Sequence, residues 1–379
     1  MDIADYSKGN GYSKSNLTEN GTPIILYGRL YTKYQFAIDE VDTFATPKDG
    51  SIYSQGNEVI IPASGETAED IARASAVEKS GILLGGDLNI LRPFNFINPL
   101  FLALTISNGE PQKELAKKAQ GKSVVHIHNS DIQEVTVSFP TRAEQDRIVA
   151  VFRSLDNLIT LHQRKYDKLT NVKKSMLEKM FPKNGSNVPE IRFKGFSDTW
   201  EQRKLGELAV FNPKEEIPDV FEYVDLESVV DTEMLSHRTE EKATAPSRAQ
   251  RLAHTGDLFY QTVRPYQKNN YLFEKPDKHY VFSTGYAQLR PFIDGYFLLS
   301  LVQNGQFVKT VLDNCTGTSY PAINANDLAE IEVFSPKDEQ EHHQIGTYFR
   351  NLDNLITLHQ RELEKLKNLK KACLEKMFV

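Results

Sequence analysis

The ten residues Leu155-Asp156-Asn157-Leu158-Ile159-Thr160-Leu161-His162-Gln163-Arg164 recur without a change as residues 352–361 of the same chain. Identity continues downstream at the same spacing, because Leu177-Glu178-Lys179-Met180-Phe181 is repeated as residues 374–378. Upstream the likeness is weaker but keeps its order: Gly121, Ser123, Ile127 and Asp131 match Gly317, Ser319, Ile323 and Asp327. The chain is therefore predicted to contain two copies of one repeat, each a variable globular part followed by a near-constant tail.

Each tail is predicted to be one long helix. The stretch 144–180 contains neither Pro nor Gly, and a helix of that length would be roughly 55 Å long. Apolar residues follow one another in alternating steps of four and three, the a/d spacing of a coiled coil. The predicted helix-pairing residues are Ile148, Phe152, Leu155, Ile159, Leu169 and Met176 in the first tail, and Ile345, Phe349, Leu352, Ile356, Leu363 and Leu366 in the second.

The simplest arrangement pairs the two tail helices within the chain. We expect them to pack antiparallel as a coiled coil, with one globular domain at each end, in a dumbbell with pseudo-twofold symmetry. The globular parts contain short apolar runs rich in β-branched and aromatic residues between Gly, Pro and Asn turns, which predicts α/β-type domains and an α+β chain. The predicted divisions are domain 1–139, helix 140–182, linker 183–187, domain 188–336 and helix 337–379.

Composition limits the possible functions. The 51 acidic and 45 basic side chains leave a net charge of −6, so a nucleic-acid partner would need local basic patches. Cys315 and Cys373 are the only cysteines, which argues against a disulfide scaffold and fits a reducing compartment. The start of the chain has no signal-peptide pattern, and no apolar run is long enough to cross a bilayer. We expect a bacterial cytoplasmic protein with no membrane partner.

Motifs for catalysis are incomplete. Residues 121–123 resemble the end of a phosphate-binding loop, but Ala116 stands where such a loop needs its first glycine. Asn98-Pro99-Leu100-Phe101 lacks the second proline of the amino-methyltransferase motif and is better explained as a strand-to-helix turn. Residues 276–278 lack the second carboxylate of a nuclease metal site. We expect no catalytic residue and no cofactor of the chain's own.

Histidines offer little more. His126 and His128 would share one face of a strand, but no third metal ligand is evident, so a structural or DNA-facing role is favoured over a metal site. His162 and His359 interrupt the helix seams at matching places, where a polar residue favours a role in register. We expect no metal.

The repeated block closely resembles the conserved regions of the specificity subunit (HsdS) of type I restriction-modification systems. The resemblance rests on Glu144-Gln145, the 155–164 block, Lys173-Lys174 and the Glu-Lys-Met-Phe end. Residues 188–196 leading to 200–206 resemble that family's entry into a target-recognition domain, and the likeness covers the whole chain. It implies the order recognition domain, helix, recognition domain, helix, which the repeat alone also predicts.

One departure from the family pattern concerns the first copy. Met1-Asp2-Ile3-Ala4 aligns with residues 206–209, so the first copy lacks a counterpart of 188–205. This leaves the outer edge of the first domain, and any contact that segment makes with the helices or with a partner, undefined.

Loops that mix basic, amide, hydroxyl and aromatic side chains are the predicted DNA contacts, because Arg pairs with guanine, Asn or Gln with adenine, and Lys, Ser or Thr with phosphate. In the first domain they are Lys8, Asn10, Lys14, Tyr27, Arg29, Tyr31, Lys33, Tyr34, Lys122 and Ser123. In the second they are Arg248, Arg251, Gln261, Thr262, Arg264, Tyr266, Lys268, Asn269, Asn270, Thr318, Ser319 and Tyr320. Such residues also populate any solvated loop, so each remains a prediction.

Two non-identical readers on a rigid spacer predict a bipartite, asymmetric DNA target. The resemblance implies that the chain is not an enzyme by itself, that its helices dock two methyltransferase subunits, and that restriction subunits join through that complex. S-adenosylmethionine would then be used by the methyltransferase. The alternatives are a coiled-coil scaffold that binds proteins and no DNA, which the acidic net charge favours, and a self-contained methyltransferase or nuclease, against which the incomplete motifs argue.

Overall fold

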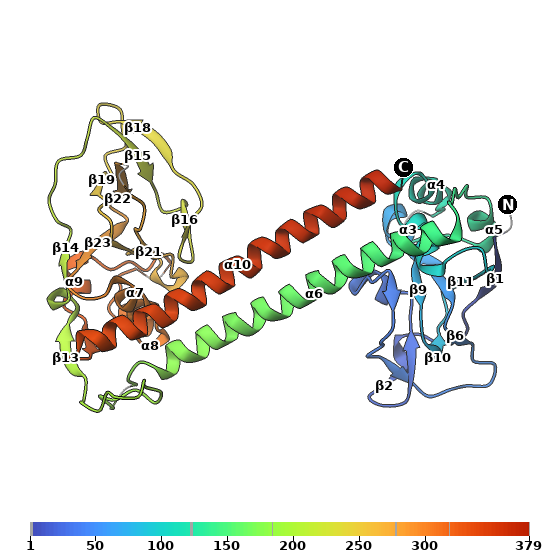
Figure 1. Cartoon of the computed structure of the whole chain (residues 1–379), viewed down its shortest axis with the longest axis horizontal. Helices are drawn as coiled ribbons and strands as arrows, with labels where there is room; N and C mark the ends of the chain where they lie inside the picture. The colour runs from blue at the N-terminus through green and yellow to red at the C-terminus, as the bar shows by residue number, and fades with distance from the viewer. Residues whose placement is uncertain (1–2, 122–123, 184, 277–278, 318, 379) are drawn as a thin grey trace. The chain divides into compact units, whose positions relative to one another are not determined.

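The computed structural model describes residues 3–121, 124–183, 185–276, 279–317 and 319–378. The chain divides into two compact units. Unit 1 consists of Met1–His162 together with Glu362–Val379, and unit 2 is Gln163–Arg361. Two long helices, α6 (Arg142–Lys179) and α10 (Glu339–Met377), contribute a part to each unit (Figure 1). Lys122, Ser123 and Thr318, three of the predicted DNA contacts, lie outside the described residues.

Unit 1 contains mixed sheets and short helices. Its other elements are β1 Ala4–Lys8, η1 Lys14–Asn16, β2 Leu17–Thr18, β3 Thr22–Ile25, α1 Arg29–Thr32, β4 Ala37–Ile38, β5 Phe44–Ala45, β6 Tyr53–Gln55, β7 Glu58–Pro62, β8 Ser64–Gly65, α2 Ala68–Ile71, β9 Ser75–Val77, β10 Ser80–Leu84, β11 Leu88–Pro93, α3 Pro99–Ile106, α4 Gly109–Lys118, β12 Val125–His126 and α5 Asn129–Gln133. The strands form the orders β1-β11-β7-β9-β4, β2-β5-β3-β10-β6 and β12-β8. The β3–β10 and β4–β9 pairs are parallel and the others antiparallel.

Unit 2 repeats this architecture with its own sequence. Its other elements are β13 Glu201–Lys204, η2 Leu205–Glu207, β14 Ala209–Phe211, β15 Val220–Val224, β16 Val229–Val230, β17 Glu233–Met234, β18 Arg238–Glu241, β19 Ala249–Leu252, β20 Leu258–Gln261, η3 Pro265–Gln267, β21 Tyr271–Leu272, β22 Tyr280–Ser283, β23 Tyr286–Pro291, α7 Gly295–Gln303, α8 Gly305–Asp313, α9 Ala325–Ala329 and β24 Glu332–Ser335. The sheets have the orders β14-β23-β20-β21, β18-β15-β22-β19, β13-β24 and β16-β17. Both units are thus mixed α and β, as the sequence predicts.

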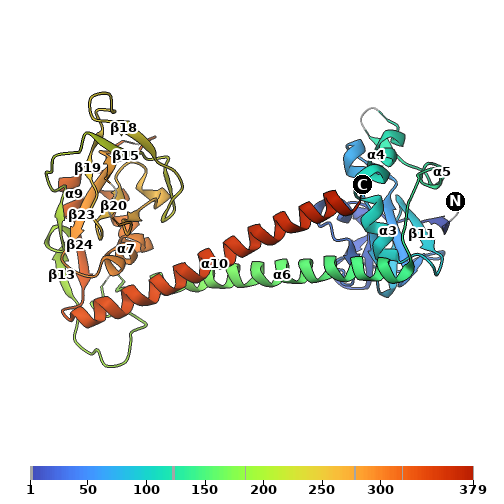
Figure 2. The same cartoon turned by 45° about the horizontal axis from the view of Figure 1, so that its top comes forward.

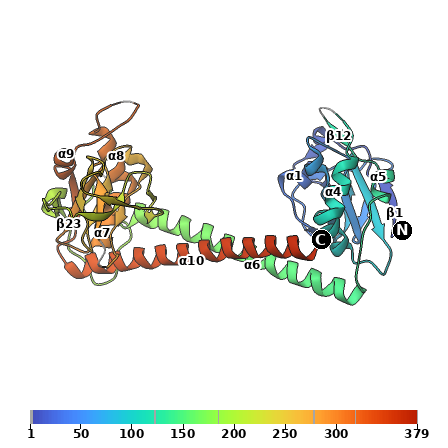
Figure 3. The same cartoon turned by 90° about the horizontal axis from the view of Figure 1, so that it is seen from above.

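In each unit, successive side chains of the central strand point alternately towards the helices and towards the second sheet, so the unit is built in layers. In β7, Val59 and Ile61 pack towards the helices, whereas Ile60 packs with residues of the second sheet. In β20, Leu258 and Tyr260 pack towards α7, whereas Phe259 stacks on the second sheet. Successive side chains of a strand point to opposite faces, so a strand buried on both faces is apolar throughout. Helix α3 covers one sheet in unit 1 (Figure 2), and α7 covers the corresponding sheet in unit 2 (Figure 3).

Helix α3 begins where the sequence predicts a strand-to-helix turn. Asn98 is its N-cap, and the side-chain Oδ1 accepts hydrogen bonds from the backbone N–H groups of Leu100 and Phe101 at 2.9 and 3.3 Å. Pro99 occupies the first helical position, where a missing N–H costs nothing. The motif therefore starts a buried helix, as expected from its sequence.

Within each unit, the two tail helices make the same contact. Lys173 pairs with Asp353 in unit 2, and Lys370 pairs with Asp156 in unit 1, both at 2.5 Å between Nζ and Oδ1. These four residues are exact counterparts in the repeat. Further along each helix there is also an aromatic contact. Phe181 lies against Phe349 in unit 2, and Phe378 lies against Phe152 in unit 1. Because residue numbers rise along one helix as they fall along the other, the segments are antiparallel within each unit.

The predicted helix-pairing residues are buried or half-buried. Phe152 and Leu155 lie in the core of unit 1, and Ile345, Phe349 and Leu352 in the core of unit 2. The remaining members are Ile148, Ile159, Leu169, Met176, Ile356, Leu363 and Leu366, of which Leu363 is fully buried and the others are partly buried. Several of these side chains pack against the globular core as well as the other helix, a use that the heptad spacing does not predict.

Residues 188–205 close one edge of unit 2. Trp200 packs edge-on against Phe181 and Phe297, and Arg192 forms a bidentate ion pair with buried Glu341, at 2.7 and 2.8 Å. Strand β13 then pairs with β24. In unit 1 the counterpart of Glu341 is Glu144, which is exposed. The contacts made by 188–205 are therefore present in one unit of the described chain.

Candidate nucleic-acid interface

In unit 2, two backbone hydrogen bonds at Thr262, one to Gly285 and one to Ile323, bring segments with predicted DNA contacts together; we call these bonds the backbone frame. The Thr262 N–H donates to Gly285 O, and the Ile323 N–H donates to Thr262 O, both at 3.0 Å. The end of β20 thus lies between the β22–β23 turn and Ile323. Two further bonds attach the arginines to this frame: Arg264 N–H to Pro321 O, and Thr284 N–H to Arg248 O, both 2.8 Å. Residues distant in sequence therefore share one edge of the unit.

The loop after β20 has an unusual backbone. Arg264 and Lys268 flank η3 with φ values of 53° and 58°, in the left-handed region. For residues other than Gly this conformation costs about 1–3 kcal/mol and persists only where the surroundings enforce it. Here buried side chains do so: Gln261 Nε2 donates to Val263 O at 2.6 Å, and Asn270 Oδ1 accepts from the Gln261 N–H at 2.9 Å.

Burial changes the expected role of three predicted contacts. Gln261, Asn270 and Thr262 are 2%, 1% and 8% exposed, and each is hydrogen-bonded inside the loop or to the β22–β23 turn. Their sequence surroundings suggest solvated loop donors, but Gln261 Nε2, Asn270 Oδ1 and Thr262 Oγ1 are bonded to backbone groups of this strained loop and of the β22–β23 turn. They hold the loop in place and are not presented at the surface.

Arg264 and two tyrosines are presented by this loop and its neighbour. The Arg264 guanidinium lies over the Tyr320 ring at 4.5 Å, and the Tyr320 and Tyr266 side chains are 63% and 50% exposed. Arg264 forms no ion pair with any residue that the structure describes. A guanidinium that lies over an exposed ring, with N–H donors that bond to no residue the structure describes, can bind a hydrogen-bond acceptor.

The other predicted DNA contacts of unit 2 differ in how exposed their side chains are and in whether their polar groups are already bonded. Arg248 and Ser319 are exposed, and Arg251 is half-buried at β19, where burial without a carboxylate partner lowers its pKa. The Lys268 Nζ donates to Gln303 O at 2.8 Å, and burial lowers the pKa of Lys268. Asn269 Oδ1 accepts from the Asp231 N–H at 2.9 Å.

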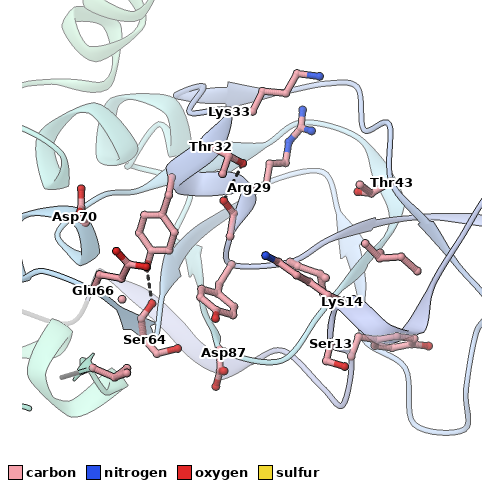
Figure 4. Close-up of a pocket in the computed structure, with 18 of the residues that line it drawn as sticks. Ser13, Lys14, Arg29, Thr32, Lys33, Thr43, Ser64, Glu66, Asp70 and Asp87 are labelled. Atoms are coloured by element: carbon pink, nitrogen blue, oxygen red, sulfur yellow. Dashed lines mark hydrogen bonds between the residues drawn. The ribbon is translucent and has the colours of Figure 1, made fainter.

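A hollow in unit 1 gathers five of its predicted contacts. Its volume is about 1010 Å³, and Lys14, Tyr27, Arg29, Tyr31 and Lys33 are among the residues that line it (Figure 4). The other predicted residues lie outside the lining: Lys8 is exposed at the end of β1, Asn10 donates to Gly50 O at 2.7 Å, and Tyr34 lies under the Arg73 guanidinium at 5.2 Å.

Two cations of the hollow are already paired. Arg29 and Lys33 both bind Asp42, at 2.8 and 2.6 Å. The hydrogen bond from Lys33 is the main cause that lowers the pKa of Asp42 to about 2, with the Arg29 bond adding to it. Arg29 also donates to Gln35 and to Glu40 O, so its guanidinium is committed within the unit. Lys14 and Tyr27 make no side-chain hydrogen bond or ion pair with the residues that the structure describes, and the exposed Lys33 ammonium keeps N–H donors beyond its bond to Asp42, so these three have polar groups left for a ligand.

Acidic and phenolic groups form the other side of the hollow. The Tyr31 hydroxyl donates to Ser64 O, and burial raises the pKa of Tyr31, which keeps the phenol protonated. Glu66, Asp70 and Asp87 line the same space (Figure 4). These carboxylates are not among the predicted contacts, which are basic, amide, hydroxyl and aromatic residues; the turn sequence Gly85-Gly86-Asp87 was the available signal for Asp87, and its φ is 58° in the structure.

The hollow of unit 1 and the edge of unit 2 that carries Arg264 occupy equivalent positions of the repeat. In unit 1 the Ala63 N–H donates to Asp87 O at 2.8 Å and the Ile127 N–H to Ala63 O at 3.0 Å. These bonds correspond to those of Thr262 with Gly285 and Ile323 in unit 2. The β8–β12 pairing then places Gly65 opposite Val125, where unit 2 has Arg264 bonded to Pro321. One backbone frame therefore carries different side chains in the two units.

The two histidines considered as metal ligands add no further candidate site. His126 and His128 are exposed, and the His128 backbone N–H donates to Asp131 Oδ2 at 2.7 Å to cap α5. Among the described residues there is no group of three His, Cys, Asp or Glu side chains placed to hold a metal ion. None of the helices described here has the length and apolar character needed to span a membrane.

Similar proteins share both the sequence pattern and the fold. The chain is 22% identical over 353 residues to the Type I restriction enzyme MjaVIII specificity subunit of Methanocaldococcus jannaschii, covering 83% of this chain and 76% of that one. It is 20% identical over 298 residues to the Type I restriction enzyme EcoDI specificity subunit of Escherichia coli, covering 70% and 66%.

A solved structure agrees in fold. The crystal structure of the type I restriction-modification system S subunit from M. genitalium superposes with a TM-score of 0.58 at 17% identity, covering all of this chain and 94% of that one. The family model described as type I restriction modification DNA specificity domain matches residues 1–171 and 239–368. The chain therefore belongs to the family of type I restriction-modification DNA specificity domains.

Proposed function

We propose that this chain is the DNA-recognition subunit of a type I restriction-modification complex and that it reads a bipartite, asymmetric target. The observation that carries the proposal is the shared backbone frame with different side chains. Unit 1 places carboxylates, Tyr31 and Lys14 there, whereas unit 2 places Arg264 and Tyr320. Two readers with the same support and different donors and acceptors would select different bases in the two half-sites.

In this proposal α6 and α10 set the distance between the half-sites. Each helix has 38 or 39 residues and contributes to both units, and the antiparallel contacts at Lys173 and Lys370 support a coiled coil with pseudo-twofold symmetry. Half-sites read from one face of B-DNA lie about one helical turn apart, near 10 bp from centre to centre. The base pairs between them would not be read.

The helices are also the proposed docking surface for two methyltransferase subunits. Leu158 and Leu161 on α6 are 42% and 47% exposed, and their repeat counterparts Leu355 and Leu358 on α10 are 43% and 52% exposed. Large apolar side chains exposed at identical positions of a duplicated sequence suit two copies of one partner. Restriction subunits would join through that complex.

Catalysis is assigned to those partners. The relatives are named specificity subunits, which supports a chain that is not an enzyme by itself. The methyltransferase subunit would bind S-adenosylmethionine and transfer its methyl group to adenine, and the present chain would supply only the DNA sequence to be modified.

Co-expression with the neighbouring methyltransferase gene, followed by long-read mapping of methylated adenines, tests the proposal. We expect a single split motif with one methylated adenine in each half. Binding of the complex to duplex DNA should fall steeply with salt, because phosphate contacts release counterions. A stable complex that neither methylates nor binds DNA in a salt-dependent way would instead support the protein-binding scaffold.

A further inference from the structure

We propose that Arg264, whose guanidinium lies over the Tyr320 ring, reads a guanine in the half-site bound by unit 2. This inference rests on the proposed function and adds the identity of one base to it. The guanidinium carries five N–H donors and no acceptor. In the major groove only guanine presents two adjacent acceptors, N7 and O6, and a bidentate arginine matches both.

The surroundings of Arg264 favour a base contact over a phosphate contact. The Arg264 guanidinium carbon lies 4.5 Å from the centre of the Tyr320 ring, and this cation–π contact restricts the side chain, so less freedom is lost when two parallel hydrogen bonds form. The side chain has no ion-pair partner in the part of the chain that the structure describes, in contrast to Arg29 of unit 1, which is committed to Asp42. An arginine that served only as a positive charge would not need the contact with the ring.

The loop that carries Arg264 is built to present it. Its left-handed backbone is held by buried Gln261 and Asn270, and the Arg264 N–H is bonded to Pro321 O next to Tyr320. The cation and the ring beneath it are therefore fixed by one backbone contact. Gln261 and Asn270 are positioning residues in this scheme, because they act through the loop.

The test uses the complex of the full chain with its methyltransferase and a library of DNA duplexes randomised in both half-sites. Wild type should select guanine at one position of one half-site. Arg264→Lys keeps the charge and Arg264→Gly relieves the left-handed backbone; both should reduce that preference by about 5- to 150-fold, the range expected for one bidentate base contact. Selection at every position of the other half-site should stay unchanged.

Three further measurements separate base reading from folding. Tyr320→Phe retains the ring and should keep the guanine preference, whereas Tyr320→Ala should lose part of it. Replacing the selected guanine by 7-deazaguanine removes N7; this should weaken binding by wild type and leave Arg264→Gly unaffected. Arg248→Ala, which removes an exposed cation on the same edge, should weaken all sequences equally.

The outcomes distinguish the two proposals. If wild type selects a split sequence but the Arg264 variants select the same bases, or weaken all sequences equally, the guanine assignment is wrong and the recognition function stands. If wild type selects no sequence, the proposed function fails, and the Arg264 assignment with it.

Discussion

Equivalent positions of the repeat have different environments in the two units, so the effect of a residue's surroundings can be judged against its counterpart. Glu341 is 1% exposed and paired with Arg192, whereas its counterpart Glu144 is exposed. His342 is buried against Ser335, whereas its counterpart Gln145 is buried with its amide donating to Phe96 O and Pro140 O. Each pair supplies a comparison, because the counterpart is the equivalent position in a different environment.

Removing Arg192 should destabilise unit 2 strongly. In Arg192→Ala the buried Glu341 carboxylate loses both guanidinium bonds, and breaking a buried ion pair costs about 3–5 kcal/mol. The free energy of unfolding from urea titration measures the loss. Glu144→Gln, at the exposed counterpart, should change it by less than about 0.5 kcal/mol. A small effect of Arg192→Ala would show that solvent reaches Glu341.

The stability of unit 2 should depend on the charge of His342. Burial lowers the pKa of His342 below its ordinary value, so the unfolded chain binds the proton more tightly than the folded chain. The contribution is fully present above the ordinary pKa near 6.5 and is lost as the pH falls through the lower folded pKa. His342→Gln copies Gln145 and should remove this loss; equal pH profiles for wild type and variant would contradict it.

Aromatic residues at the ends of the two long helices belong to the globular cores. Phe378 contacts Phe101 and Phe152 in unit 1, and Phe181 contacts Phe297 and Phe349 in unit 2. The helices are therefore structural parts of the domains, and Phe181 and Phe378 are as buried as residues of the central strands.

Truncating either aromatic should destabilise the unit to which it belongs. Phe378→Ala should cost about 3–5 kcal/mol in unit 1, and Phe181→Ala a similar amount in unit 2, because each leaves a cavity in a close-packed core. Hydrogen exchange resolved by peptide assigns the loss to a unit. Met377→Ala, at a neighbouring side chain that is 43% exposed, is the matched control and should have little effect.

The long helices were predictable at the level of elements, because a sustained apolar spacing without Pro or Gly is a local signal. The role of Asn98 as an N-cap was predictable for the same reason. The frame that joins Ala63, Asp87 and Ile127 was not, because its hydrogen bonds connect segments far apart in sequence. The same limit explains Gln261 and Asn270: polar residues in a loop look solvent-exposed until the loop's own backbone is seen to need them.

At the scale of the whole molecule, a helix insertion tests the ruler proposal. Seven residues, two helical turns, would be inserted at equivalent points after Leu161 and Leu358, which keeps the heptad seam in both helices. The added length is about 10 Å, or about three base pairs of B-DNA. Methylation mapping should show a longer spacer with unchanged half-sites; an unchanged spacer would contradict the ruler.

Domain exchange tests whether the two readers are independent. Replacing residues 188–336 with the corresponding segment of another family member should alter one half of the methylated motif and leave the other half and the spacer unchanged. Changes in both halves would show that the units do not read DNA separately.

Assembly of unit 1 from the first and last parts of the chain has a consequence for biosynthesis. Unit 2 is a single continuous segment, Gln163–Arg361, but unit 1 needs Phe378 to complete its core. At about 5–20 residues per second, the ribosome takes roughly 10–40 s to travel from residue 162 to residue 378. During that interval the nascent first domain exposes the surface that the last helical turn later covers, so unit 2 should reach its native state first.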